Sequence, residues 1–265
     1  MRRILISIVI ASLTAVLASC RRSEENPLQV CSTEFPAELL PQNFTLGGVP
    51  SGFEIRQVIL KGKKWPTGST LRVRFLNGTQ TQQAKFRQYA ASWIRPQGGP
   101  SSELANLGLT YVTAEPSDIR VRFASDGSSH SAIGTNAKSI GSNNETMHFG
   151  WFNSSTTEDD YRRTITHEFG HALGLVHEHQ HPVSGIAWNR QQVYSDMGKK
   201  GWSKKTVDDN ILNAYSSSQT QYIKLDPSSI MIYRIPKSWT TNGFSAPWNT
   251  RLSTADRTFI ASQYP

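Results

Sequence analysis

The stretch that decides the fold reads His167-Glu168-Phe169-Gly170-His171-Ala172-Leu173-Gly174-Leu175-Val176-His177-Glu178. Two residues four apart on a helix differ by about 40° in direction and by one turn of rise, so His167 and His171 point to the same side. Two imidazoles placed in this way bind one metal ion between them. Glu168 is rotated by about 100° from His167 and lies beside the ion without having to bind it. That position suits a general base acting on metal-bound water.

The third histidine of the stretch requires a break in the helix. On a continuous helix, His177 would be turned away from His171 by about 240°. Gly174 allows the chain to stop and turn back, because glycine adopts the left-handed conformation at a helix C-terminus without a steric penalty. His167, His171 and His177 are therefore predicted to bind one zinc ion as neutral imidazoles. A coordination position stays open for water, as in catalytic zinc sites.

A chance pattern or a structural zinc site would account for these histidines less well. A bare H-E-x-x-H pattern also arises among unrelated surface residues, but the added Gly174 and His177 make coincidence improbable. A structural zinc site usually has four protein ligands and favours cysteine, and no cysteine lies near this stretch. His179 and His181 are expected at the rim of the site or in solvent, with additional metal ligation as the alternative.

The N-terminus has the features of an export signal. Arg2 and Arg3 precede an apolar run from Ile4 to Leu17, which is too short to span a bilayer as a helix but suits a signal peptide. The run ends in Leu17-Ala18-Ser19-Cys20, which resembles a bacterial lipobox. Cys20 is therefore predicted to carry lipid and to anchor the exported chain to a cell-envelope membrane. A cleaved signal peptide without lipid is the alternative.

One domain is expected after this signal. Residues 1–19 are the predicted signal peptide, residues 20–50 a lipidated N-terminus and linker with several prolines, and residues 51–265 a single catalytic domain. Cys31 has no partner within the chain if Cys20 is lipidated, because the sequence holds two cysteines. A latent form in which the Cys31 thiolate binds the zinc is one hypothesis, against a buried or exposed thiol.

The composition excludes several classes of protein. Hydrophobic residues make up 37% of the chain and charged residues 18%, which is unlike a disordered chain or a coiled coil. The formal net charge of +8 permits contact with nucleic acid or anionic surfaces, but no run of Lys and Arg is longer than two. A nucleic-acid partner is therefore not expected, and the charge is consistent with the solubility of an exported protein.

Periodicity outside the histidine stretch indicates a mixed α+β fold. The segment Ser69–Leu76 alternates apolar and polar residues and predicts a strand. Thr79 is expected to cap a helix that runs to about Ile94, and Thr156 or Thr157 to open the helix that carries the histidines. Further strands are predicted at Leu109–Thr113, Asp118–Phe123, Ala132–Ile140 (a weak edge strand) and Thr146–Trp151.

Several motifs together resemble one family of metallopeptidases. The run from His167 to His177 matches the H-E-x-x-H-x-x-G-x-x-H signature of the metzincins. Glu178 directly after it resembles the astacins, and so does Ser229-Ile230-Met231-Ile232-Tyr233, since the astacin Met-turn has Met two residues before Tyr. The segment from Leu252 to Pro265 looks like the final helix of such domains. The chain thus resembles a bacterial astacin-like lipoprotein over roughly residues 60–265.

This resemblance implies a fold, a cofactor and a substrate class. The fold is a zincin-like α+β domain with a twisted mixed sheet and two long helices in an upper lobe, and an irregular, partly helical lower lobe. One zinc ion per chain would serve an endopeptidase whose protein or peptide substrate lies extended in the cleft, against an edge strand. Met231 would pack beneath the metal as a structural residue. Tyr233 resembles the astacin tyrosine that binds zinc in the resting enzyme and then donates to the substrate oxygen.

The sequence also departs from the animal astacins. Those enzymes carry disulfides, which this chain lacks internally if Cys20 is lipidated. The astacin pattern has Arg four residues after the third histidine, where this chain has His181, and usually His between Met and Tyr, where this chain has Ile232. These differences separate the chain from the animal digestive enzymes.

The predicted activity is hydrolysis of peptide bonds, in which Glu168 takes a proton from zinc-bound water and returns it to the leaving amine. A zinc-containing adhesion or binding module without turnover is the first alternative, which the retention of Glu168 disfavours. A basic binder of nucleic acid or envelope polymer is the second, because seven tryptophans offer stacking surfaces. Two of these tryptophans argue against this second alternative. Trp93 has the spacing of a core residue on a helix, and Trp151 lies in a predicted strand, so both are expected to pack inside the domain.

Overall fold

The structure is a computed structural model that describes residues 57–218 and 220–265. The predicted signal peptide, the predicted linker, Cys20 and Cys31 lie outside the described residues. In the part of the chain that the structure describes, no helix combines the length and the apolar character needed to cross a bilayer.

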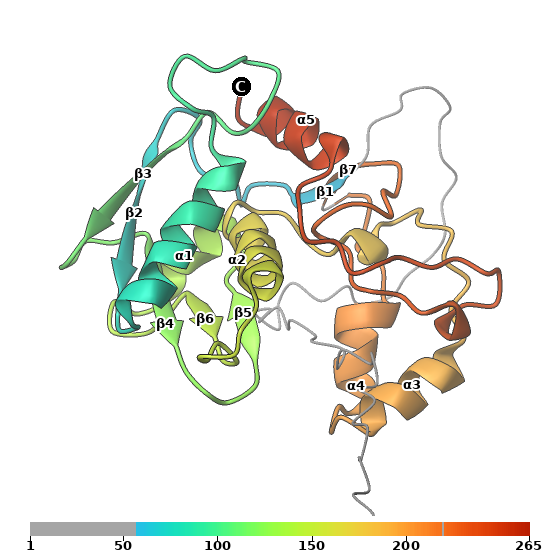
Figure 1. The fold of residues 1–265 in the computed structure, drawn as a ribbon. Helices are drawn as coiled ribbons and strands as arrows, with labels where there is room; N and C mark the ends of the chain where they lie inside the picture. The colour runs from blue at the N-terminus through green and yellow to red at the C-terminus, as the bar shows by residue number, and fades with distance from the viewer. Residues whose placement is uncertain (1–56, 219) are drawn as a thin grey trace, which may run out of the picture.

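A five-stranded mixed sheet lies in the upper lobe, at the left of Figure 1. Its order is β3-β2-β4-β6-β5, and β5 runs antiparallel to β6 while the other pairs are parallel. The strands are β2 (Thr70–Phe75), β3 (Gly108–Val112), β4 (Ile119–Phe123), β5 (Ser129–Ser131) and β6 (Met147–Phe149). A separate antiparallel pair joins β1 (Gln57–Leu60) to β7 (Thr220–Ile223).

Two helices, α1 (Gln80–Ala90) and α2 (Glu158–Ala172), lie side by side against this sheet (Figure 1). Thr79 caps α1 in a capping box with Gln82, and the Thr157 side chain accepts a hydrogen bond from the third residue of α2. Both caps confirm the predicted helix starts. The first helix ends earlier than predicted, because Ala91–Trp93 form a tighter 3-10 turn, η2.

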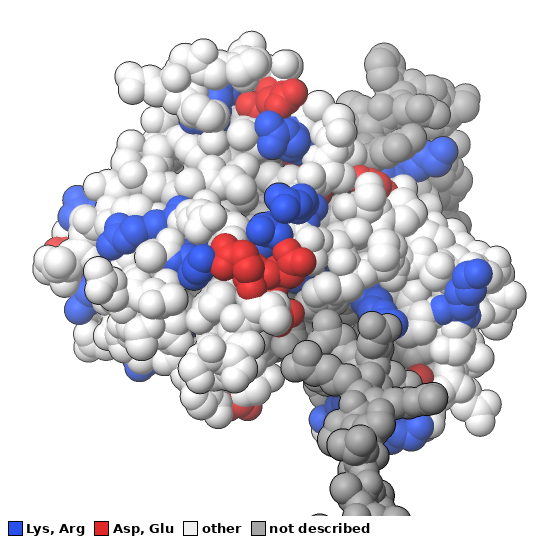
Figure 2. All heavy atoms as spheres, viewed as in Figure 1, with Lys and Arg blue, Asp and Glu red and all other residues white. Residues whose placement is uncertain are grey.

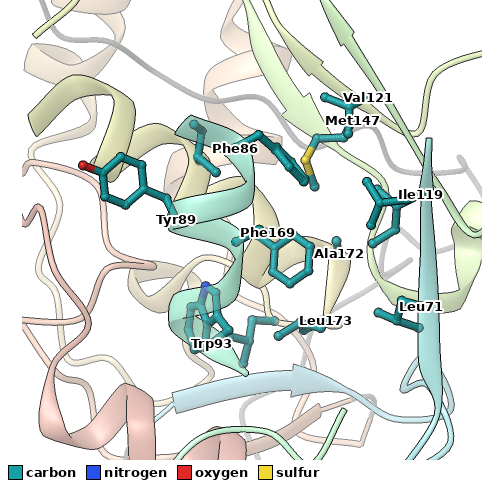
Figure 3. Packing of buried hydrophobic residues seen from close by; sticks show 14 of the residues in the cluster. Leu71, Phe86, Tyr89, Trp93, Ile119, Val121, Met147, Phe169, Ala172 and Leu173 are labelled. Carbon is teal, nitrogen blue, oxygen red and sulfur yellow. The ribbon is translucent and has the colours of Figure 1, made fainter. Parts of the chain in front are cut away.

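Aromatic and aliphatic side chains fill the space between the helices and the sheet (Figure 3). Phe86 of α1 and Phe169 of α2 are fully buried, with ring centroids 6.0 Å apart in an edge-to-face arrangement. Val121 and Met147 face them from the strands. Burying a side chain of this size contributes about 1.5–3 kcal/mol. This core fixes α2, and with it the first two histidines of the motif, relative to the sheet.

The lower lobe has its own hydrophobic cluster and little regular structure. It contains α3 (Arg190–Gly198), α4 (Lys204–Val207) and the wide helical turn η5 (Asp208–Leu212). The last helix, α5 (Thr254–Gln263), returns to the upper lobe, where the Tyr264 hydroxyl donates to the Leu173 carbonyl over 2.7 Å. The chain therefore has the predicted α+β class, with a mixed sheet and two helices above an irregular, partly helical lobe.

The strand predicted at Ala132–Ile140 is wrong. The edge strand β5 lies earlier, and residues Gly134–Ser139 form the 3-10 helix η3. Gly134 has φ +50°, and a Cβ there would overlap the Lys63 carbonyl oxygen. That oxygen also accepts a hydrogen bond from the Thr135 N–H over 2.9 Å. A contact with a distant part of the chain therefore bends this segment out of the sheet.

Charged side chains of both signs are spread over the face shown in Figure 2. Several basic side chains of the described residues lie next to acidic ones, as in the pairs Lys85–Glu158 at 2.6 Å and Arg257–Glu103 at 2.7 Å. Exposed pairs of this kind contribute about 0–1 kcal/mol each. On the face in Figure 2 the basic side chains are therefore interspersed with acidic and neutral ones.

Candidate active site

The last turns of α2 bring His167 and His171 together. Both side chains are fully buried, and their Nε2 atoms lie 3.2 Å apart. The two rings meet edge to face at 87°, with centroids 4.7 Å apart. This is the convergence that the spacing of four residues predicts.

The helix ends where the sequence predicts it. Gly174 has φ +98°, and its N–H donates to the His171 carbonyl over 2.8 Å. The next N–H, of Leu175, donates to the Gly170 carbonyl over 3.0 Å. These two bonds form a Schellman motif, in which the residue of positive φ reverses the chain. The reversal brings His177 back, so that its Nε2 lies 3.2 Å from the Nε2 of His171.

The hydrogen bonds of the first two histidines define which ring nitrogen carries the proton. The Nδ1 of His167 lies 2.9 Å from the Ile230 carbonyl oxygen, and the Nδ1 of His171 lies 2.9 Å from the Leu175 carbonyl oxygen. A carbonyl oxygen only accepts, so Nδ1–H is the donor in each pair. In the neutral ring, Nε2 then carries a lone pair that points into the space between the histidines.

The third histidine is oriented in the same way by a side chain. The Nδ1 of His177 lies 3.2 Å from Oε1 of Gln180. The Gln180 amide nitrogen donates to the carbonyls of Asp209 and Asn213 over 2.7 and 3.0 Å, which leaves Oε1 facing the ring. His177 therefore also donates through Nδ1 and presents its Nε2 lone pair.

Three Nε2 lone pairs that converge in a buried space fit a zinc ion. Nitrogens about 2.0–2.1 Å from one ion at tetrahedral angles lie roughly 3.3 Å apart, and two of the three pairs here are at 3.2 Å. Among the described residues, this is the one group of three ligand-type side chains that converges in this way.

Burial keeps the three imidazoles neutral. It lowers the pKa of His167 and of His177 well below the usual value for histidine, and it lowers the pKa of His171 to about 4. The positive charge of Arg163 adds to the lowering of the pKa for His167 and His171. Neutral rings with free lone pairs are the form that binds metal.

Two further predicted site residues lie at the triad. Glu168 is fully buried on α2, next in sequence to His167. Tyr233 is 5% exposed, and its ring centroid lies 4.3 Å from that of His177 and 6.1 Å from that of His167. The structure therefore places the ring of Tyr233 beside the histidines and buries Glu168 on the helix that carries two of them.

His179 and His181 are both buried, so the alternative that they lie in solvent is wrong, while His179 lies beside the triad with its ring centroid 5.1 Å from that of His177. The Nε2 of His179 donates to the Asn210 carbonyl over 3.0 Å, and its ring lies against that of Tyr233, tilted by 36° with centroids 4.5 Å apart. The Nδ1 of His181 accepts from the Val183 N–H over 3.0 Å. Neither residue belongs to the convergent group. The lower lobe buries them because they lie on the turn η4 (Glu178–Gln180) and its C-cap, beneath η5.

The Met-turn (Ser229–Tyr233) packs directly under α2. A Cβ on Gly170 would overlap the Met231 sulfur, so a glycine at this helical position allows the close approach. Backbone polar groups of the turn are bonded to distant segments. The Ile230 N–H donates to Asp256 Oδ2 over 2.9 Å, and the Met231 carbonyl accepts from the Glu178 N–H over 3.1 Å.

Arg163 fastens the Met-turn to α2, and sequence reasoning missed it. One of its Nη atoms donates to the Ile230 carbonyl and the other donates to the Ile232 carbonyl, the latter over 2.7 Å. Arg163 is 2% exposed, and its guanidinium lies over the Trp248 ring, 4.9 Å from the centroid. One feature of the sequence could have indicated that Arg163 belongs to the site. It lies four residues before His167 and therefore on the same face of the helix.

Comparison with known proteins agrees with this geometry. No protein-family model matches the chain, and no curated protein sequence matches it. Among solved structures, one of myroilysin is 44% identical, covers 78% of this chain and 98% of its own, and has a TM-score of 0.73. A second myroilysin structure is 39% identical, covers 91% and 92% of the two chains, and has a TM-score of 0.62.

A hatching enzyme zinc-protease from Oryzias latipes (medaka fish), high choriolytic enzyme 1, is 16% identical. It covers 76% of this chain and 94% of its own with a TM-score of 0.51, a similarity that supports the fold alone.

The fold and the histidine group define a zinc metalloprotease of the metzincin type, a hydrolase that acts on protein or peptide substrates with one zinc ion. Within that class, the chain belongs to the astacin family, as its relationship to myroilysin shows.

Replacing Arg163 by Met should lower the free energy of unfolding by about 2–4 kcal/mol, because it removes charged donors from two buried carbonyls. Urea unfolding measures the loss. Arg162→Met is the matched control, since Arg162 pairs with the exposed Asp159 and should cost less than about 1 kcal/mol. Equal losses in the two variants would show that the Arg163 clamp adds nothing to stability.

Proposed function

We propose that His167, His171 and His177 hold the zinc ion of this protease and that Glu168 is its general base. The observation that supports this assignment is the convergence of three Nε2 atoms, with 3.2 Å from His171 to each of the other two, together with the burial of Glu168 on the same helix. Glu168 follows His167 on the helix and is rotated from it by about 100°, so in this proposal its carboxylate serves the attacking water and is not a fourth ligand.

In the proposed mechanism, zinc activates the water and the substrate carbonyl group, and Glu168 transfers the proton. Zinc, when bound, lowers the pKa of water to about 7 and offsets negative charge on the substrate carbonyl oxygen. Glu168 takes one proton from the attacking water while the new C–O bond forms. The same carboxyl group then gives that proton to the leaving amide nitrogen as the C–N bond breaks.

Tyr233 is the proposed donor to the substrate oxygen. Its ring belongs to the hydrophobic cluster of the lower lobe and lies 4.3 Å, centroid to centroid, from the ring of His177, so the side chain borders the triad. A phenol O–H aimed at the place where charge develops stabilises the transition state more than the ground state. Met231 has no chemical role in this proposal, because its sulfur packs against Gly170 below the histidines.

The edge strand β5 is the proposed support for the substrate. Among the described strands, β5 pairs with β6 alone, which leaves its second edge without a strand partner. An extended peptide adds to such an edge through main-chain hydrogen bonds.

We further propose that Cys20 carries lipid and that the enzyme is exported and held at a bacterial cell-envelope membrane. The support is the apolar run before Leu17-Ala18-Ser19-Cys20. Two or more acyl chains on one residue give stable anchoring, whereas one chain gives reversible binding.

Glu168→Ala should leave zinc near one ion per chain and reduce peptide hydrolysis by at least about 100-fold, the usual scale for loss of a general base. Zinc content by atomic absorption and cleavage of a quenched peptide are the two measurements. Asp159→Ala, an exposed acidic residue on the same helix, should keep full activity. Near-normal activity of Glu168→Ala would overturn the assigned role.

Tyr233→Phe keeps the ring and removes the hydroxyl. Loss of a donor that acts in the transition state should cost about 2–4 kcal/mol, which is a roughly 30- to 1000-fold fall in kcat. Zinc content and the thermal unfolding midpoint should stay near those of the wild type. Tyr111→Phe in β3, in the upper lobe, is the control. Activity of Tyr233→Phe within about twofold of wild type would mean that Tyr233 only packs.

Cys20→Ala should abolish lipid labelling and release the protein from membranes. Metabolic labelling with a fatty-acid analogue in the native host, followed by membrane fractionation, measures both effects. Labelling of Cys31→Ser should equal that of the wild type. A wild-type protein that incorporates no label would contradict the proposed anchor.

A further inference from the structure

The helical segment α4–η5 of the lower lobe ends in an unusual way. Its last turn is wide, because the Asn213 N–H donates to the Asp208 carbonyl, five residues back, over 2.9 Å. Carbonyls in the last turn of a helix must find donors outside it. Here the donors come from η4: Gln180 Nε2 binds the Asp209 carbonyl over 2.7 Å, and His179 Nε2 binds the Asn210 carbonyl over 3.0 Å.

Gln180 uses all of its polar groups in this connection. Its amide nitrogen donates to the carbonyls of Asp209 and Asn213, and its own backbone carbonyl accepts from the Tyr215 N–H over 2.8 Å. The side chain is almost fully buried. With both amide protons used, Oε1 is the atom left to accept the proton on Nδ1 of His177.

The three histidines differ in what holds them. The Nδ1–H groups of His167 and His171 donate to backbone carbonyls. The Nδ1–H of His177 donates to the side chain of Gln180, which is itself oriented by the end of η5. The direction of the third imidazole therefore depends on a segment of the lower lobe more than 30 residues away, since Asp209 follows His177 by 209 − 177 = 32 positions.

We infer that Gln180 is a positioning residue that couples zinc binding at His177 to the ordering of α4–η5. The inference rests on the proposed role of His177 as the third ligand. Partners that orient a ligating histidine typically change metal affinity about 10- to 100-fold. The coupling is reciprocal: an ordered η5 favours zinc binding, and bound zinc favours an ordered η5. A helix as short as α4 depends on such tertiary contacts, because short helices are marginal on their own.

The first test compares zinc affinities by competition with a chromophoric chelator. Gln180→Ala should raise the zinc dissociation constant by about 10- to 100-fold. Gln192→Ala is the matched control, because the Gln192 amide also bonds within the lower lobe, to Asp196 Oδ1 over 3.0 Å, but not to a histidine. Its dissociation constant should stay within about twofold of wild type.

The second test separates the two ends of the Gln180 side chain. Gln180→Glu keeps an oxygen that accepts from Nδ1 of His177. It replaces the amide nitrogen by a second oxygen, which cannot donate to the carbonyls of Asp209 and Asn213. Its zinc affinity should therefore fall less than that of Gln180→Ala. Amide hydrogen exchange of residues 207–213, with and without zinc, reports the ordering of η5. Zinc should slow exchange there by about fivefold or more in the wild type, and this effect should disappear in both variants.

Two results would overturn the inference. One is a zinc dissociation constant of Gln180→Ala within about twofold of wild type. The other is equal zinc-dependent protection of residues 207–213 in the wild type and both variants. Exchange of the α1 amides, in the upper lobe, shows whether each variant is folded.

A His177→Ala variant distinguishes failure of this inference from failure of the proposed ligand set. If His177→Ala binds zinc as tightly as the wild type, the proposed ligand role of His177 is wrong. If His177→Ala loses zinc and Gln180→Ala keeps it, the ligand set stands and the coupling through Gln180 is wrong.

Discussion

The structure depends on three imidazole lone pairs that point at one another in a buried space. The Nε2 atoms lie 3.2 Å apart in two of the pairs, yet no hydrogen bond joins them, because each ring carries its proton on Nδ1. Without a cation this contact is unfavourable, and burial opposes protonation of the rings. A metal ion bound between the rings removes this repulsion between lone pairs. The free energy of metal binding therefore adds to the stability of the fold.

The spacing of residues in the histidine stretch predicted the local part of this arrangement. Residues four apart on a helix share a face whatever surrounds them, so the approach of His167 to His171 followed from geometry alone. The positive φ of Gly174 and the return of His177 followed from the same reasoning. The class of fold could also be predicted, because strands β2 and β4 alternate clearly and Thr79 and Thr157 give strong helix starts.

Contacts between distant segments could not be predicted in this way. The segment Ala132–Ile140 was predicted as a weak edge strand, but the Lys63 carbonyl holds it in another conformation. Arg120 occupies a polar position of its strand and is nonetheless buried, because the carbonyls of Asn144 and Ile140 cover its guanidinium. Gln180 is a polar residue shortly after the motif, and no pattern in the sequence indicates its contact with η5. In each case the conformation or burial of a residue depends on backbone carbonyls that only the tertiary fold brings near.

The three groups that orient the histidines show why the long motif predicts so much more than H-E-x-x-H. The Leu175 carbonyl belongs to the turn after Gly174, the Ile230 carbonyl to the Met-turn, and Gln180 Oε1 to the turn beside η5. The Met-turn is held in addition by Asp256 of α5 and by Arg163 of α2. A helix with two histidines alone would leave their rings free to rotate. All three rings are oriented only when the helix end, the Met-turn and the lower lobe each supply an oxygen, so the arrangement of the histidines depends on the folding of both lobes.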